Sequence, residues 1–231
     1  MSAPLIDVSD IRHRYGDRTV LSLPGWTLEK GQHSLLLGPS GSGKSTLLNI
    51  LTGLITPSEG RVMVDGVCIS TLPPARRDQA RGQLFGIVFQ NIRLISALTV
   101  RQNLRLARSL AKRSADEKLL EDLIQGLGIA HRADAKPRAL SQGEAQRAAI
   151  ARAAAQNAPI LIADEPTSAL DRGNAERAID LLMTVADRTG ATLIVATHDD
   201  RIRSRFSHVL DLGDTDMTTD PSDDRSSGDI S

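Results

Sequence analysis

A glycine-rich segment, GPSGSGKST at residues 38–46, constrains the fold of this chain more than any other feature. It fits the pattern G-x-x-x-x-G-K-[ST], in which glycines let the backbone wrap around a phosphate group. The context is the required one, because the apolar run HSLLL precedes the segment and TLLNILTGL, a helix pattern, follows it. A strand, a phosphate-binding loop and a helix in this order predict an α/β, doubly wound fold.

In such a loop the backbone N–H groups and the N-terminus of the next helix point at phosphate oxygens. The side chain of Lys44 is predicted to reach the β- and γ-phosphates, and the hydroxyl of Ser45 to bind Mg²⁺. The expected ligands are ATP and Mg²⁺; the alternative, a glycine-rich turn without a ligand, fits this context poorly. We expect the nucleotide to be bound by the whole loop, Gly38, Pro39, Ser40, Gly41, Ser42, Gly43, Lys44, Ser45 and Thr46.

Two adjacent carboxylates end another apolar run, ILIADEP at residues 160–166. Such a pair repels itself unless a cation is close by, and Mg²⁺ supplies that cation. Asp164 is therefore predicted to hold the metal, and Glu165 to act as the general base on the attacking water. Taken alone, an Asp-Glu pair at this place is more often a helix N-cap, but the phosphate loop favours the catalytic interpretation.

Single polar side chains end two further apolar runs, IVFQ at 87–90 and IVATHDD at 194–200. An isolated Gln or His at a strand end is usually a surface or capping residue. In a doubly wound fold, however, strand ends border the ligand crevice. We therefore expect Gln90 to act through Mg²⁺ and the water, as a metal ligand and catalytic residue, and His198 to donate a hydrogen bond to the γ-phosphate.

The remaining apolar runs divide the chain into a core and an insertion. Strands are predicted at 5–8, 34–37, 61–64, 86–89, 160–163 and 192–196. The segment between Leu98 and Asn157 instead has long Ala-, Leu-, Arg- and Gln-rich stretches at helical spacing. This predicts one domain, residues 1–213, with its core at 1–90 and 159–213 and an inserted helical subdomain at about 91–158.

Charge and cysteine content restrict the class of protein. Basic and acidic residues both number 28, which argues against bulk nucleic acid as the main partner. The balance hides an acidic tail, residues 214–231, with six Asp and one Arg, which we expect to be disordered; the rest carries a net charge of +5. One cysteine, Cys68, and the absence of an apolar run of about 18 residues favour a chain that is neither exported nor membrane-spanning.

The stretch ALSQGEAQRAAIARAAAQ, residues 139–156, raises a separate question, since a glycine stands near the start of an otherwise good helix pattern. Ser141 and Glu144 have the S-x-x-E spacing of a capping box, in which the hydroxyl and the carboxylate satisfy free backbone amides. A cap of this kind does not require Gly143.

Taken together, residues 4–213 resemble the nucleotide-binding subunits of ATP-binding-cassette (ABC) transporters, with the family's motifs in the family's order. The resemblance implies the ABC ATPase fold, a RecA-like P-loop NTPase core with an inserted helical subdomain. It also implies that LSQGE at 140–144 is the signature sequence, which binds the γ-phosphate of an ATP held by a second subunit. A side chain at Gly143 would bar close approach of that phosphate. Two cassettes would then sandwich two ATP molecules head to tail.

Further residues match the family one at a time. Tyr15 stands where an aromatic residue stacks on adenine, although a packed core tyrosine is the alternative. Asp171, in Ser168–Asp171, matches the loop that links the two sites across the dimer. Ser141, Gly143 and Glu144 belong to the signature that contacts the nucleotide. Gln142 departs from the commonest signature, which has a second glycine here; we expect it to tune activity rather than abolish it.

The stretch ARGQLFGIVFQNIRLISALTVRQNL, residues 80–104, narrows the subgroup. Together with LSQGE it is similar to the lipoprotein-releasing, macrolide-exporting and cell-division ATPases, which drive four-helix membrane partners by mechanical transmission. The resemblance implies an ATP-hydrolysing subunit at the cytoplasmic face of the inner membrane, peripheral, docked on integral membrane permease subunits near Gln90. The ATPase of an amino-acid-type importer is the alternative, because TV-x-x-NL also occurs there. A soluble cassette ATPase without membrane subunits remains a further alternative.

Overall fold

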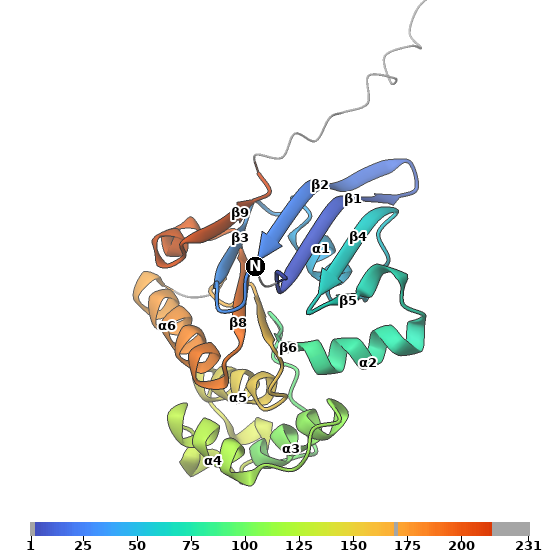
Figure 1. Cartoon of the computed structure of the whole chain (residues 1–231). Helices are drawn as coiled ribbons and strands as arrows, with labels where there is room; N and C mark the ends of the chain where they lie inside the picture. The colour runs from blue at the N-terminus through green and yellow to red at the C-terminus, as the bar shows by residue number, and fades with distance from the viewer. Residues whose placement is uncertain (1–2, 169–170, 214–231) are drawn as a thin grey trace, which may run out of the picture.

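The computed structural model describes residues 3–168 and 171–213 (Figure 1). The predicted disorder of the tail at 214–231 lies outside these residues, as do Ala169 and Leu170. In the described part of the chain, no helix combines the length and the apolar character that crossing a membrane requires.

A parallel sheet forms the centre of the molecule, with strands in the order β6-β7-β8-β3-β9. Its members are β3 (Ser34–Leu37), β6 (Phe85–Val88), β7 (Ile160–Asp164), β8 (Thr192–Thr197) and β9 (His208–Asp211). All neighbouring pairs are parallel. β3 and β8 are buried along their whole length, which explains why they read as continuous apolar runs. Strand β9 was not predicted, because HVLD has only two apolar residues.

A second, antiparallel sheet has the strand order β2-β1-β4-β5. It consists of β1 (Ile6–Tyr15), β2 (Arg18–Leu28), β4 (Glu59–Val64) and β5 (Val67–Cys68). One face of this sheet is buried, so β1 alternates buried with exposed positions and extends well beyond the predicted 5–8. Strand β2 was missed because Pro24 and Gly25 interrupt its pattern.

Six helices complete the described fold: α1 (Lys44–Leu51), α2 (Pro74–Leu84), α3 (Val100–Leu110), α4 (Glu117–Gly126), α5 (Gln142–Ala154) and α6 (Arg172–Thr189). Short 3₁₀ turns lie at Ile69–Thr71, Ala130–Arg132, Pro137–Ala139 and Asp200–Arg205. Figure 1 places α3 and α4 at the end of the molecule opposite β1, β2 and β4. Every regular element described between residues 100 and 154 is helical, in line with the composition of that stretch.

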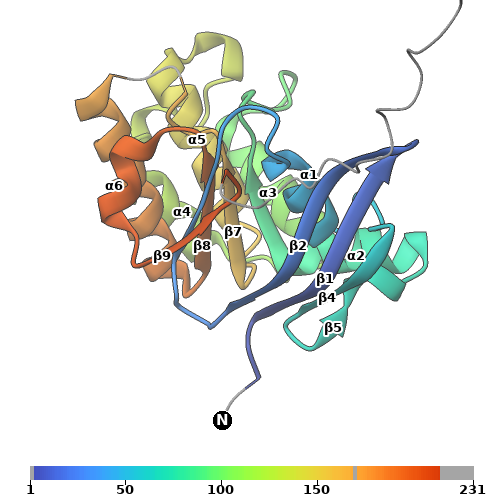
Figure 2. The same cartoon turned by 90° about the horizontal axis from the view of Figure 1, so that it is seen from above.

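The core has two apolar clusters, one on each face of the parallel sheet. One joins α1 and the antiparallel sheet to the parallel sheet, through residues such as Leu47, Val62 and Ile162. The other packs α5, α6 and the helices α3 and α4 against its opposite face. In Figure 2 the parallel strands accordingly lie between α6 and the antiparallel sheet.

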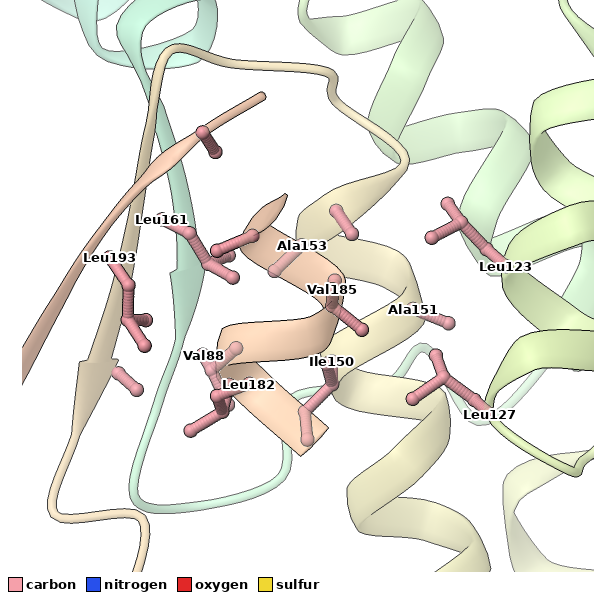
Figure 3. Close-up of a cluster of buried hydrophobic side chains, with 14 of the residues drawn as sticks. Val88, Leu123, Leu127, Ile150, Ala151, Ala153, Leu161, Leu182, Val185 and Leu193 are labelled. Carbon is pink, nitrogen blue, oxygen red and sulfur yellow. The ribbon is translucent and has the colours of Figure 1, made fainter. Parts of the chain in front are cut away.

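Helix α5 connects the sheet to the rest of the helical region. Figure 3 shows Ala153 directed toward the strands, while Ala151 lies toward Leu123 of α4 and toward Leu127, which follows that helix. Close approach depends on Gly86 of β6, where an added Cβ would lie 2.5 Å from the carbonyl oxygen of Ala153. Small residues on both sides therefore let α5 lie directly on the sheet.

Candidate functional site

The carboxyl ends of the parallel strands border one cleft of about 490 Å³. Parallel strands end at the same edge of a sheet, so the loops after β3, β6, β7 and β8 meet there. The end of β1 and the start of β2 close the cleft from the antiparallel sheet. Its lining residues are Tyr15, Arg18, Val20, Ser40, Gly41, Gly43, Lys44, Ser45, Thr46, Gln90, Glu165 and His198.

The phosphate loop turns directly into α1, as its sequence pattern predicts. Gly43 caps the helix with φ 95°, a left-handed conformation that favours glycine. An added Cβ there would also lie 2.9 Å from the carbonyl oxygen of Val20. The Ser42 hydroxyl is buried and lacks a hydrogen-bond partner among the described residues. Gly43, Ser45 and Thr46 at the start of α1 line the cleft, and because the first N–H groups of a helix have no intrahelical partner, this is the arrangement that binds phosphate.

Lys44 is buried, although it carries a charge. Its ammonium group donates to the carbonyl oxygens of Gly38 and Pro39, at 2.7 and 3.0 Å. It also lies 3.7 Å from Oε1 of Glu165. Gly38 and Pro39 do not line the cleft; they contribute the carbonyl oxygens that hold the Lys44 ammonium group. The loop thus fixes a buried cation against the carboxylate predicted as general base.

Glu165 is held in a strained conformation at the end of β7. Its φ is 49°, an uncommon value for a residue with a side chain. Its backbone N–H donates to the carbonyl oxygen of Ala196 at 2.8 Å, which fixes the turn to β8. Its Oε2 accepts the Thr197 hydroxyl at 3.0 Å and lies 2.9 Å from Nδ1 of His198. Strain of this kind persists only where surrounding contacts over-determine it, and it is concentrated at functional sites.

Asp164 provides a test of the predicted metal. Its Oδ1 is buried and has no hydrogen-bond partner among the described residues. Burial raises the pKa of this carboxyl, the nearby Glu165 raises it further, and Lys44 lowers it. A buried carboxylate oxygen without a hydrogen-bond partner fits a bound Mg²⁺. No cluster of three or more His, Cys, Asp or Glu side chains that could hold a metal occurs in the described chain. Mg²⁺ in nucleotide sites needs few protein ligands, because the phosphates and water supply the others.

The cleft is lined by Tyr15, which was predicted, and by Arg18 and Val20, which were not. Tyr15 lies at its mouth, 58% exposed, with its ring edge-on to the buried His13 at 4.8 Å between centroids. Arg18 and Val20 line the same mouth from β2. These two were missed because β2 was missed: a recognised hairpin around Gly16 would have placed them opposite the strand end that carries Tyr15.

The signature residues lie elsewhere. Ser141, Gly143, Glu144 and Asp171 are all absent from the lining of the cleft. Gly143 instead lines a second cavity, of about 400 Å³, between α5 and α6. The predicted capping box is confirmed: Ser141 caps α5 and accepts the N–H of Glu144, while the Glu144 side chain accepts the N–H of Ser141. Asp171 caps α6 in a similar way, accepting the N–H of Asn174 at 2.9 Å.

Glu144 has more partners than the cap alone requires. Its Oε1 accepts Nε–H of Arg132 at 2.9 Å and lies 3.0 Å from Nε2 of His131. The N–H of Ser141 first, then Arg132 and His131, lower the pKa of Glu144 from 4.5 to about 2. Its carboxylate therefore fixes the start of α5.

This gives a prediction for stability against pH. A carboxyl whose pKa is lowered on folding stabilises the native state above its ordinary pKa, and that contribution is lost as pH falls toward the folded value. Wild type should therefore exceed Glu144→Gln in stability at pH 7, and the difference should shrink between pH 4.5 and about 2. Urea unfolding at a series of pH values measures it. A difference independent of pH would contradict the ionic role.

The parallel sheet and the phosphate loop at the end of β3 place the molecule in the class of P-loop nucleotide-binding α/β proteins, as predicted. The chain is a member of the ABC transporter family, whose pattern matches residues 22–168. The predicted family and fold class are thus confirmed.

Relatives and solved structures of this family resemble the chain over most of its length. The macrolide export ATP-binding/permease protein MacB of Escherichia coli O157:H7 is 37% identical over 224 residues, 94% of this chain. The chain spans 34% of the length of that relative. The dimeric structure of MJ0796, a bacterial ABC transporter cassette, superimposes with a TM-score of 0.78 at 33% identity, covering 90% of this chain and 95% of that one. A post-hydrolysis state of MJ0796 bound to ADP and Pi matches equally well, at 32% identity.

Proposed function

We propose that this chain is the ATP-hydrolysing subunit of an ABC transporter that powers membrane permease subunits. One observation carries the proposal: the cleft brings the buried Lys44, Glu165 in its strained conformation and His198 together beside the N-terminus of α1. These are a phosphate-binding cation, a base and a hydrogen-bond donor, the groups that hydrolysis of ATP to ADP and phosphate requires.

In this proposal Lys44 and His198 bind the γ-phosphate and Tyr15 stacks on adenine. Glu165 takes a proton from a water molecule, whose oxygen bonds to the γ-phosphorus while the bond to the bridging oxygen of ADP breaks. Ser45, Gln90 and Asp164 would hold Mg²⁺, which when bound neutralises phosphate charge. All of these residues except Asp164 line the cleft, and Asp164 lies directly before Glu165 at the end of β7.

The second half of each site is proposed to come from another copy of the cassette. Within the described chain nothing requires glycine at 143: an added Cβ would meet only the tip of Arg147, at 3.5 Å. Since Gly143 and Ser141 stand at the positive end of α5, a γ-phosphate from outside the chain fits there. Asp171 would contact the facing subunit. Glu144 would contribute by fixing the end of the helix. The dimeric structure of MJ0796 supports such a pairing by similarity.

The membrane partner is proposed to dock beside Gln90, at the cytoplasmic face of the membrane. The segment after Gln90 exposes Ile92 and Ile95, at 41% and 47%. These two side chains, three residues apart, can contribute apolar contacts to a protein partner. The name of the relative, macrolide export ATP-binding/permease protein, supports a membrane permease partner of the macrolide-export type, which the resemblance at residues 80–104 groups with the lipoprotein-releasing ATPases. No role for nucleic acid is proposed.

A nucleotide titration tests the ATPase proposal. Lys44→Ala should abolish binding of a fluorescent ATP analogue, because the substitution leaves no buried cation for the phosphates and leaves Glu165 without its counter-charge. Wild type should bind the analogue and hydrolyse ATP in the presence of Mg²⁺. Equal affinity in both proteins, each shown to be folded by circular dichroism, would contradict the assignment of the cleft.

A further inference from the structure

Thr197 is a buried polar residue beside the cleft that the proposed mechanism does not use. It ends β8, directly before His198, and is 0% exposed. It does not line the cleft. Its hydroxyl nevertheless lies 3.0 Å from Oε2 of Glu165.

The neighbouring backbone determines the direction of this hydrogen bond. The N–H of Asp199 donates to the Thr197 oxygen at 3.1 Å, so the hydroxyl proton is free to point at Glu165. Asp199 is itself buried and accepts two side-chain hydrogen bonds from Arg201, at 2.7 and 2.6 Å. The Thr197 hydroxyl, which donates to Glu165, is therefore oriented by the N–H of Asp199, and Asp199 is itself held by Arg201.

The other two partners of Glu165, Lys44 and His198, are expected to change their contacts when ATP binds. Lys44 and His198 are the groups that the proposed function assigns to the γ-phosphate. The His198 side chain is 50% exposed and has room to move. Thr197 has no such freedom, because β8 is hydrogen-bonded on both sides, to β3 and β7. A phosphate that takes over Lys44 and His198 leaves Thr197 in place.

We propose that Thr197 is the positioning residue for the catalytic carboxylate: its hydroxyl holds Oε2 of Glu165, so that Oε1 faces the cleft and accepts the proton from water. This inference rests on the proposed function, because it assigns Thr197 a role only if Glu165 is the base. Thr197 itself touches no reacting atom. Its contribution should therefore appear in the rate of hydrolysis and not in the binding of ATP.

Replacement of the hydroxyl by a methyl group of similar size tests this. Thr197→Val should lower kcat about 10- to 100-fold, as expected for loss of one hydrogen bond to a charged group, with KM for ATP within about threefold of wild type. Thr197→Ser, which keeps the hydroxyl, should retain kcat within about threefold. Thr192→Val is the matched control, since Thr192 is equally buried at the other end of β8 and its hydroxyl accepts the N–H of Gly31. It should leave kcat unchanged.

A second comparison separates positioning from general destabilisation. In the Glu165→Gln background, Thr197→Val should have no further effect on residual turnover, because the two residues act as one unit. If Glu165→Gln loses hydrolysis while Thr197→Val turns over at the wild-type rate, the inference fails and the proposed function stands. If Glu165→Gln hydrolyses ATP normally, the proposed base itself is wrong. Should Thr197→Val not fold, the comparison of Thr197→Ser with Thr197→Ala decides, and equal loss of kcat in both overturns the inference.

Discussion

Glu165→Gln should lower the ATP turnover rate by about 10²- to 10⁴-fold, the usual contribution of a general base. The amide keeps the size of the side chain and an oxygen that accepts the Thr197 hydroxyl, but it cannot take a proton from water. ATP affinity should stay within a few-fold of wild type, because the phosphate loop and Lys44 are untouched. Single-turnover hydrolysis and ATP titration measure the two quantities separately.

The same variant should accumulate as an ATP-bound dimer, since closure precedes hydrolysis in the proposed cycle. Light scattering with and without ATP and Mg²⁺ detects it. Glu117→Gln is a suitable control, because Glu117 is an exposed carboxylate paired with Arg105 on the helical region; it should neither slow turnover nor trap a dimer. A turnover rate in Glu165→Gln equal to wild type would rule out the catalytic assignment.

The trapped variant also gives access to the membrane partner. Purified with ATP from detergent-solubilised membranes, it should bring with it a four-span membrane protein with a large extracytoplasmic domain. A many-span partner would instead support the importer alternative. Recovery of the dimer without any membrane protein would favour a soluble cassette ATPase.

The residues at the carboxyl ends of the parallel strands were predictable from sequence, whereas of the residues opposite them only Tyr15 was predicted, through the resemblance to the family. Lys44, Gln90, Glu165 and His198 each follow an apolar run, and parallel strands necessarily bring such ends to one edge. Arg18 enters the cleft from β2, whose apolar pattern Pro24 and Gly25 interrupt.

Thr197 was missed for a different reason. It lies at the end of a run in which every residue is buried, so nothing in the pattern separates it from its apolar neighbours. Its hydroxyl acquires a role only through the left-handed backbone at Glu165, and positive φ at a residue with a side chain has no reliable sequence signal. The side chains that contact a residue with such a backbone conformation can therefore be identified only from the structure.

Gly143 was predicted from the signature sequence, yet no contact within the described chain requires a glycine at this position. Gly143→Asp should not destabilise the fold: the introduced carboxylate stands in the first turn of α5, where negative charge is favourable, and within reach of Arg147. The thermal unfolding midpoint should stay the same or rise. ATPase activity should nevertheless fall by at least about 100-fold, because a carboxylate there repels the γ-phosphate of the facing subunit. Gly143→Ala should have a smaller effect on activity.

Mixing two inactive variants distinguishes a shared site from a self-contained one. In a head-to-tail dimer of Lys44→Ala with Gly143→Asp, one site contains both defects, and the other combines an intact phosphate loop with an intact signature. Turnover in an equimolar mixture should therefore rise above that of either variant alone, with an upper limit of about a quarter of wild type if the two sites act independently. If each chain completed its own site, every site in the mixture would carry one defect and activity would not return. Whether turnover of the mixture exceeds that of each variant alone thus decides whether Gly143 faces a nucleotide held by another chain.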